Sequence, residues 1–190
     1  TPIDDMFFNT SGSGNVDLGI YKWPRFGDPI INEPIGVSIS ITPEIIDECF
    51  KKIHSGENGT HVNSQLVNCC FKISNDNNRR GKKSINRKII DKNLKCNGIS
   101  NRKLPPKEFI SDIVKSKFVI SPEGNGVDTH RSWEAIYFKS IPIIENNADI
   151  IFKYRDLPVI FTNDYTEITP EYLEKKYIEI RNTVFDFSPL

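Results

Sequence analysis

The sequence predicts an α/β domain of Rossmann-like type, in which a parallel sheet carries helices on both faces. From residue 65 onward, short apolar segments of strand length alternate with segments in which apolar residues recur at helical spacing. The strand segments are apolar throughout rather than at every second position, which is typical of parallel strands buried on both faces. Such sheets bind ligands where the strands end and the following helices begin. We therefore expect a site at the carboxyl ends of the strands.

The charge composition narrows the class of function. The chain has 190 residues, of which 25 are Lys or Arg and 25 are Asp or Glu, so its formal net charge is zero. This balance argues against a general nucleic-acid coat or a membrane-surface protein, because both need an excess of positive charge. Hydrophobic residues make up 37% of the chain, which is enough for a packed core. No apolar run approaches the roughly 18–20 residues of a membrane-spanning helix, so no membrane span is expected.

The chain divides into two parts of unequal regularity. Residues 1–64 are expected to form an irregular lead, because Gly, Pro and Ser recur through its first forty positions. One helix is predicted within the lead, since Thr42 suits the N-cap, Pro43 suits the first helical position, and apolar residues then recur as far as Ile53. Residues 65–190 are expected to form the Rossmann-like domain.

The elements of this domain follow in regular order. Proline and glycine mark several boundaries: Pro105 and Pro106 suit the first turn of a helix, and a glycine-rich turn follows the buried strand at Phe118. Strands are predicted at 66–73, 117–121, 141–144 and 158–162, helices at 84–92, 107–116, 129–139 and 170–182, a polar loop at 74–83, and a weak strand or turn at 96–100.

The turn between the second strand and its helix carries the strongest functional signal. Gly124 and Gly126 let the backbone approach a ligand closely, and Asp128 is a candidate N-cap. The N–H groups of a first helical turn favour an anion. Arg131 and Glu134 share one helix face, where an arginine can hold a phosphate and a carboxylate can accept from ribose hydroxyls. The alternative is a surface ion pair beside an ordinary turn.

Residues 115–144 read KSKFVISPEGNGVDTHRSWEAIYFKSIPII. They resemble the donor-binding signature of exostosin-like glycosyltransferases, in particular the C-terminal domain of the ribitol xylosyltransferase type and its relatives in large DNA viruses and microbes. The shared pattern is Lys-x-x-Phe, a short strand, Ser-Pro-x-Gly-Asn-Gly-x-Asp-x-x-Arg-x-Trp-Glu, a helix, and a strand reading x-Pro-Ile. The resemblance extends over residues 65–190 and fades before them.

The resemblance implies the C-terminal half of a GT-B glycosyltransferase, in which two Rossmann-like domains face a cleft. Residues 1–64 are too short for a second such domain, so the N-terminal domain is expected to be separate or missing, with the lead as a remnant or a part of it. The implied activity is transfer of a sugar from a nucleotide-diphosphate donor, of UDP or GDP type, to a hydroxyl of a glycan or glycoprotein, with inversion. No metal or cofactor is expected, since the Asp-x-Asp signature of metal-dependent enzymes is missing from the sequence.

The resemblance also implies roles for individual residues. Arg131 would bind the donor phosphates and Glu134 the ribose, while Trp133 would pack the helix on the sheet. The backbone expected to line the nucleotide belongs to Glu123, Gly124, Asn125 and Gly126.

A basic cluster supplies a second candidate for phosphate binding. Six basic residues lie between Arg79 and Lys88 in an otherwise neutral chain. One or two of Arg79, Arg80 and Arg87 are expected to reach the donor, with the lysines in solvent. A solvated basic loop is the alternative. A nucleic-acid site is disfavoured because no aromatic residues are interleaved with the charges.

The general base is not assigned by the sequence. His54 and His61 flank the predicted linker, where either could face a cleft. Glu145 and Asn146 follow the third strand, so they could contact the base or sugar or serve as loop and capping residues. Asp156 is interpreted as a turn residue.

The cysteines point to no metal or redox chemistry. They form no C-x-x-C pair and match no zinc spacing, so all are interpreted as reduced structural residues. The four are Cys49, Cys69, Cys70 and Cys96.

Two functions remain in competition at the level of sequence. One is the glycosyltransferase described above, with the nucleotide sugar and the acceptor as its partners. The other is a non-catalytic nucleotide-binding or interaction module derived from such a domain. The expected compartment is the cytoplasm for a viral or microbial source and the Golgi lumen for a eukaryotic secretory enzyme.

Overall fold

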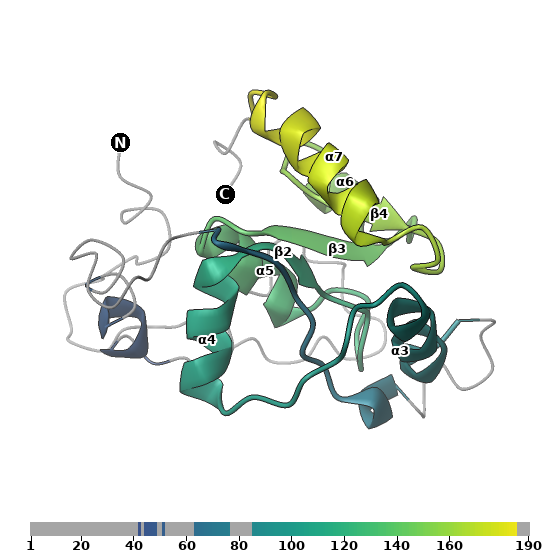
Figure 1. The fold of residues 1–190 in the computed structure, drawn as a ribbon, viewed down its shortest axis with the longest axis horizontal. Helices are drawn as coiled ribbons and strands as arrows, with labels where there is room; N and C mark the ends of the chain where they lie inside the picture. Colours follow the sequence, from purple (N-terminus) through teal and green to yellow (C-terminus); the bar gives the residue numbers. More distant parts are fainter. Residues whose placement is uncertain (1–41, 43, 49–50, 52–62, 77–84, 186–190) are drawn as a thin grey trace, which may run out of the picture.

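The computed structural model describes residues 42, 44–48, 51, 63–76 and 85–185. The described part contains a sheet of four strands, all parallel, in the order of the chain (Figure 1). The α/β class and the parallel sheet are therefore confirmed. The strands are β1 (Gln65–Asn68), β2 (Ser116–Ile120), β3 (Ile141–Glu145) and β4 (Ile160–Thr162).

Helices connect and follow these strands. They are α3 (Arg87–Cys96), α4 (Pro106–Lys115), α5 (His130–Tyr137), α6 (Ile151–Tyr154) and α7 (Pro170–Arg181), with a 3-10 turn, η3 (Ile73–Asp76). Residues 44–48 are helical, as the sequence predicts. The short helix α6 was not predicted. The segment at 96–100 is a turn and not a strand, with Gly98 at a φ of 78°.

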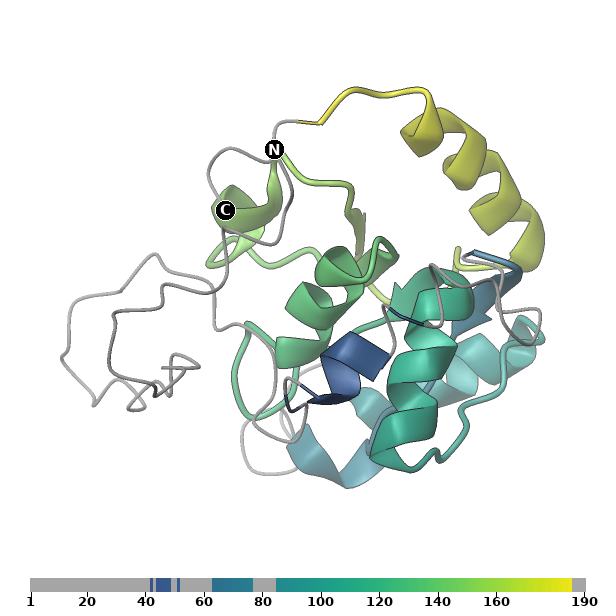
Figure 2. The same cartoon turned by 90° about the vertical axis from the view of Figure 1, so that its left-hand side faces the viewer.

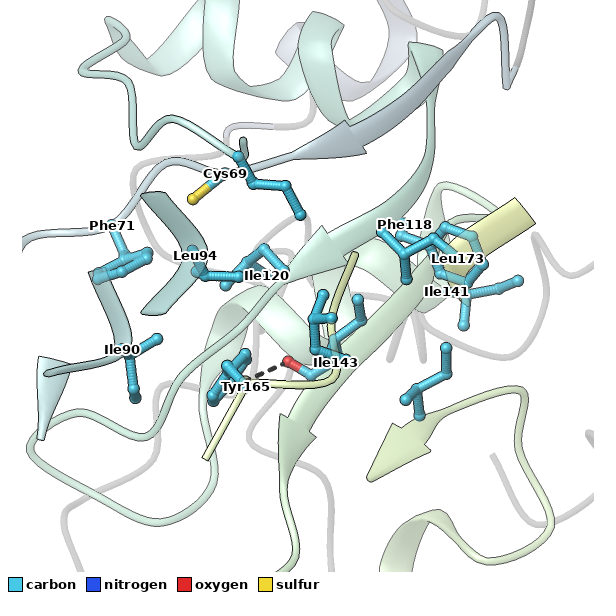
Figure 3. Close-up of a cluster of buried hydrophobic side chains, with 13 residues drawn as sticks. Cys69, Phe71, Ile90, Leu94, Phe118, Ile120, Ile141, Ile143, Tyr165 and Leu173 are labelled. Atoms are coloured by element: carbon cyan, nitrogen blue, oxygen red, sulfur yellow. Dashed lines mark hydrogen bonds between the residues drawn. The ribbon is translucent and has the colours of Figure 1, made fainter. Parts of the chain in front are cut away.

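Helices cover both faces of the sheet. Successive residues of a strand point to opposite faces, and the packing of β2 follows this rule. Phe118 and Ile120 pack in a cluster with α3 and α7, whereas Val119 packs in another with α4 and α5. Figure 1 shows α4 and α7 on opposite sides of β3, and Figure 3 shows the first cluster in detail.

The second face is covered by the segment at 44–48 and by α4, α5 and α6. Ile46, from the segment at 44–48, packs in one cluster with Ile113 of α4 and Ala135 of α5. Figure 2 shows this segment, in dark blue, beside α4 and α5. Further along the same face, α6 packs on α5 through Trp133 and Tyr154, whose rings stack with centroids 4.8 Å apart.

The helix starts follow local rules. The side chain of Asn86 caps α3 by accepting from the backbone N–H groups of Lys88 and Ile89. Thr169 caps α7 by accepting from the N–H of Tyr172, and Pro170 occupies its first turn.

Some predictions fall outside the described residues. These are the irregular lead over residues 1–41, most of the polar loop at 74–83, and the side chains of Arg79, Arg80, His54, His61 and Cys49. No helix in the described part of the chain is long and apolar enough to cross a membrane.

Candidate functional site

Buried polar residues mark the edge of the sheet where its strands end, which we call the carboxyl edge. Asn68, Glu145 and Thr162 are the last residues of β1, β3 and β4, and each is at most 5% exposed. Ser121, directly after β2, is buried as well. Since buried polar groups need partners, this edge is where the fold holds its hydrogen-bonding chemistry.

Arg87, the first residue of α3, holds the loop after β2. Its side chain is buried and donates from Nε to the carbonyl of Glu123 (2.8 Å) and from Nη2 to the carbonyl of Pro122 (2.9 Å). Nη1 donates to the carbonyl of Lys72, beyond β1 (2.8 Å). The guanidinium therefore joins the segments that follow two neighbouring strands.

The side of Gly124 where a side chain would begin faces Arg87. A Cβ atom on Gly124 would lie 2.8 Å from Nη2 of Arg87, closer than such atoms approach in proteins. At Gly126 a Cβ atom would lie 3.4 Å from the carbonyl oxygen of Asp128, an ordinary contact. Only the first of the two glycines is thus required by close packing with a neighbour.

Two buried carboxylates fix the other side of the loop. The N–H of Glu123 donates to Oε2 of Glu145 (2.9 Å), and Oε1 of Glu123 accepts from the side chain of Asn147 (2.6 Å). The phenol of Tyr165 also donates to Oε2 of Glu145 (3.1 Å). Tyr165 is fully buried and has a φ of 62°. For a bulky residue this conformation carries strain.

Asp128 does not cap α5, contrary to the prediction, because Thr129 occupies that position. The carboxylate of Asp128 instead accepts from Tyr154 Oη (2.6 Å) and Trp133 Nε1 (3.0 Å), and lies 3.4 Å from Lys153 Nζ. Burial, and then the charge of Asp128, raise the pKa of the Tyr154 phenol. Asp128 thus ties the end of the loop to α6.

The start of α5 is held to the end of β2 by three hydroxyl groups. The Oγ of Ser121 lies 2.9 Å from both Thr129 Oγ1 and Ser132 Oγ, and the latter two lie 3.1 Å apart. Each hydroxyl can donate to one neighbour and accept from the other.

Arg131 is the predicted phosphate ligand. The residue is partly exposed, but its Nε atom is buried and has no hydrogen-bond partner among the described residues. Its guanidinium lies 5.3 Å from the ring centre of Phe109 on α4. Burial lowers the pKa of this group below its ordinary value, against the opposing effect of the Glu134 charge. Glu134 is buried at 3% exposure, one turn further along α5.

The remaining predicted residues are more peripheral. Asn125 is exposed at the tip of the loop, and Asn146 is exposed and donates to the side chain of Asn163. Asp156 pairs with its neighbour Arg155 in solvent. Cys69 and Cys70 are buried free thiols, while Cys96 is exposed. Within the described ranges, no group of three His, Cys, Asp or Glu side chains is placed to hold a metal ion.

Sequence reasoning missed Tyr165 and the backbone contacts of Arg87. The available signal was a polar residue at the last position of three strands, each preceded directly by apolar residues, which marks the carboxyl edge. Nothing in the sequence indicated that the guanidinium of Arg87 would turn toward backbone carbonyls.

No protein-family model matches the chain, and no curated protein matches it in sequence. The resemblance to exostosin-like glycosyltransferases therefore rests on the motif at 115–144.

Proposed function

We propose that the chain binds a nucleotide-diphosphate sugar at the carboxyl edge and is the donor-binding part of a GT-B glycosyltransferase. The observation that carries this proposal is the state of Arg131. Its Nε is buried and has no hydrogen-bond partner in the described part of the chain, and burial lowers its pKa. A guanidinium whose buried Nε lacks an acceptor favours uptake of an anion, because an anion supplies that acceptor.

The neighbours of Arg131 suit a nucleotide diphosphate. Arg131 lies in the first turn of α5, where the backbone N–H groups and the helix dipole favour negative charge. Glu134 is placed deeper on the same helix, where a carboxylate can accept hydrogen bonds from ribose hydroxyls. The motif resemblance assigns these two residues the same two roles.

The chemistry would be displacement at the anomeric carbon of the sugar. The acceptor hydroxyl oxygen forms the new bond to that carbon as the bond to the diphosphate oxygen breaks. The diphosphate leaves with the bonding electron pair, and a base takes the hydroxyl proton. Arg131 would stabilise the negative charge that develops on the departing diphosphate.

The first test is nucleotide binding, measured by thermal shift and calorimetry with UDP, GDP and their sugars. We expect wild-type chain to bind one of the two nucleotides. Arg131→Ala should weaken that binding by roughly 10- to 100-fold, because it removes hydrogen bonds between charged groups.

Arg155→Ala is the matched control, since Arg155 is an exposed arginine at the C-terminal end of α6. It should bind as wild type does. Binding of neither nucleotide, or full affinity in Arg131→Ala, would contradict the proposal. Release of free sugar from the bound donor, or transfer to a glycan, separates an enzyme from a non-catalytic nucleotide-binding module.

A further inference from the structure

We propose that Arg87 is a positioning residue for the loop at 122–126, and that glycine occupies position 124 to admit the Arg87 guanidinium rather than a ligand. The inference rests on the proposed function for its binding readout only. The contact between Arg87 and Gly124 can be tested without any ligand.

The place of Arg87 in its helix is the first indication. A positive charge in the first turn of a helix is unfavourable, because it faces the positive end of the helix dipole. Arg87 is the first residue of α3, and no acidic residue lies in that turn. The three backbone carbonyls that accept from Arg87 offset this cost, since they present their negative ends to the guanidinium.

The geometry of these bonds requires an arginine. The three acceptors belong to Lys72, Pro122 and Glu123, on two segments that both follow strands. A guanidinium offers donors on three nitrogens in one rigid plane, whereas a lysine offers one ammonium group. Arg87 also lies 5.8 Å from the ring centre of Phe71, which limits its movement on that side.

Gly124 completes the contact. A Cβ atom there would come within 2.8 Å of Nη2 and 3.5 Å of the central guanidinium carbon. The end of an arginine side chain can usually move aside, but here it is buried and holds three carbonyls. Any residue larger than glycine therefore breaks the contact that shapes the loop.

The loop is consequently shaped by the protein before a ligand arrives. Arg87 engages the carbonyls of Pro122 and Glu123, Glu145 engages the N–H of Glu123, and the N–H of Gly124 donates to the carbonyl of Gly126 (3.0 Å). A loop that is already ordered loses less entropy on binding. Disturbing Arg87 should thus weaken nucleotide binding without removing any group that touches the nucleotide.

The first experiment is a double-mutant cycle on unfolding in urea, without ligand. Gly124→Ala should raise the unfolding equilibrium constant roughly tenfold in the wild-type background, because the clash displaces a buried hydrogen bond. In the Arg87→Lys background, where Nη2 no longer exists, the same change should alter the constant less than about twofold. Gly126→Ala, whose Cβ has room, is the control and should behave alike in both backgrounds. Equal effects of Gly124→Ala in both backgrounds would overturn the contact.

The second experiment separates positioning from a direct ligand contact. Hydrogen exchange should show faster exchange of residues 121–128 in both Arg87→Lys and Gly124→Ala, and both should bind UDP or GDP roughly tenfold more weakly than wild type. Arg102→Lys, which changes an exposed arginine paired with Asp112, is the control and should change neither. Unchanged affinity in Gly124→Ala would overturn the positioning role, as would weak binding in Arg87→Lys with unaltered exchange.

The two proposals fail separately. If wild-type chain binds no nucleotide, the donor site is refuted, while the unfolding cycle and the exchange rates still decide whether Arg87 shapes the loop. If Arg87→Lys does not fold, Gly124→Ala and Gly126→Ala carry the comparison, and equal exchange of residues 121–128 in these two variants would overturn the proposal.

Discussion

Two arginines at the carboxyl edge differ in how their charge is compensated. Arg87 is buried and donates to three carbonyls, whereas Arg131 has a buried Nε without a hydrogen-bond partner among the described residues. The sequence predicts both as phosphate ligands, because each is an arginine near the start of a helix that follows a strand. The difference arises from which neighbouring segment each side chain meets, which spacing does not encode. The side chain of Arg131 is therefore suited to binding a ligand, whereas that of Arg87 is suited to holding a loop in place.

The buried thiol of Cys69 should make the free energy of unfolding decrease at alkaline pH. Burial raises the pKa of its thiol from 9.0 to about 12. The folded state therefore keeps a proton that the unfolded state releases. The free energy of unfolding is therefore unaffected by this thiol below pH 9. It falls as the pH rises from 9 toward 12, by a total on the order of 4 kcal/mol. Urea unfolding at about pH 8 and about pH 10.5 should show the decline.

The variant Cys69→Ala isolates the contribution of this thiol. We expect a clearly smaller loss of unfolding free energy between the two pH values than in wild type. Cys96→Ala removes an exposed thiol and should keep the wild-type loss. A loss in Cys69→Ala as large as that in wild type would assign the pH dependence to other groups.

At the scale of elements, two helices with side-chain caps differ in what they support. Asn86→Ala and Thr169→Ala each remove a side-chain N-cap, at an expected cost of about 1 kcal/mol in unfolding free energy. Asn86 directly precedes Arg87, so loosening the first turn of α3 should also weaken nucleotide binding. Thr169→Ala should leave binding unchanged. Calorimetric titration of both variants checks this, and equal affinities would separate the cap of α3 from the site.

The order and type of the main elements could be predicted, because apolar strand segments, prolines and glycines mark them in the sequence. The first strand was predicted too long, to residue 73. After Asn68 the apolar run continues, but the carbonyl of Cys69 accepts from the N–H of Arg102, and both backbone groups of Phe71 bond the side chain of Asn101. The run is buried without belonging to the sheet. The hydrophobic pattern reports only that these residues are buried. It could not reveal that their backbone groups bond to residues 101 and 102 in place of a neighbouring strand.

The helix α6 was missed for a related reason. It has four residues, too few for a helical period to appear, and its neighbourhood reads as a short apolar run. Its importance lies in Tyr154, which stacks on Trp133 and donates to Asp128. The sequence placed Asp128 at the N-cap because local rules describe only neighbours along the chain. Two of its actual partners, Lys153 and Tyr154, come from the helix that follows the next strand.

At the scale of the whole molecule, the location of the site could be predicted from topology. All strands of a parallel sheet point one way, so their ends gather at one edge regardless of the detailed side-chain contacts. The strand order follows the chain, and helices lie on both faces. The resulting edge brings together polar groups from residues 68 to 165, which no local pattern could connect.

The spacing of the paired strands along the chain also predicts the order in which they assemble during folding. Gln65 pairs with Ser116 across 51 residues of chain, whereas Ile120 pairs with Ile143 and Ile143 with Ile160 across far shorter spans. Closing a longer loop costs more entropy, so β2, β3 and β4 should assemble first and β1 should join afterwards. Ile143→Val is then expected to slow folding, and Val67→Ala chiefly to speed unfolding, in stopped-flow measurements. A marked slowing of folding by Val67→Ala would contradict this order.

Arg87 bridges the segments that follow β1 and β2, so its three hydrogen bonds can form only after β1 has joined the sheet. A newly made chain should accordingly acquire its core before it acquires a ligand-ready edge.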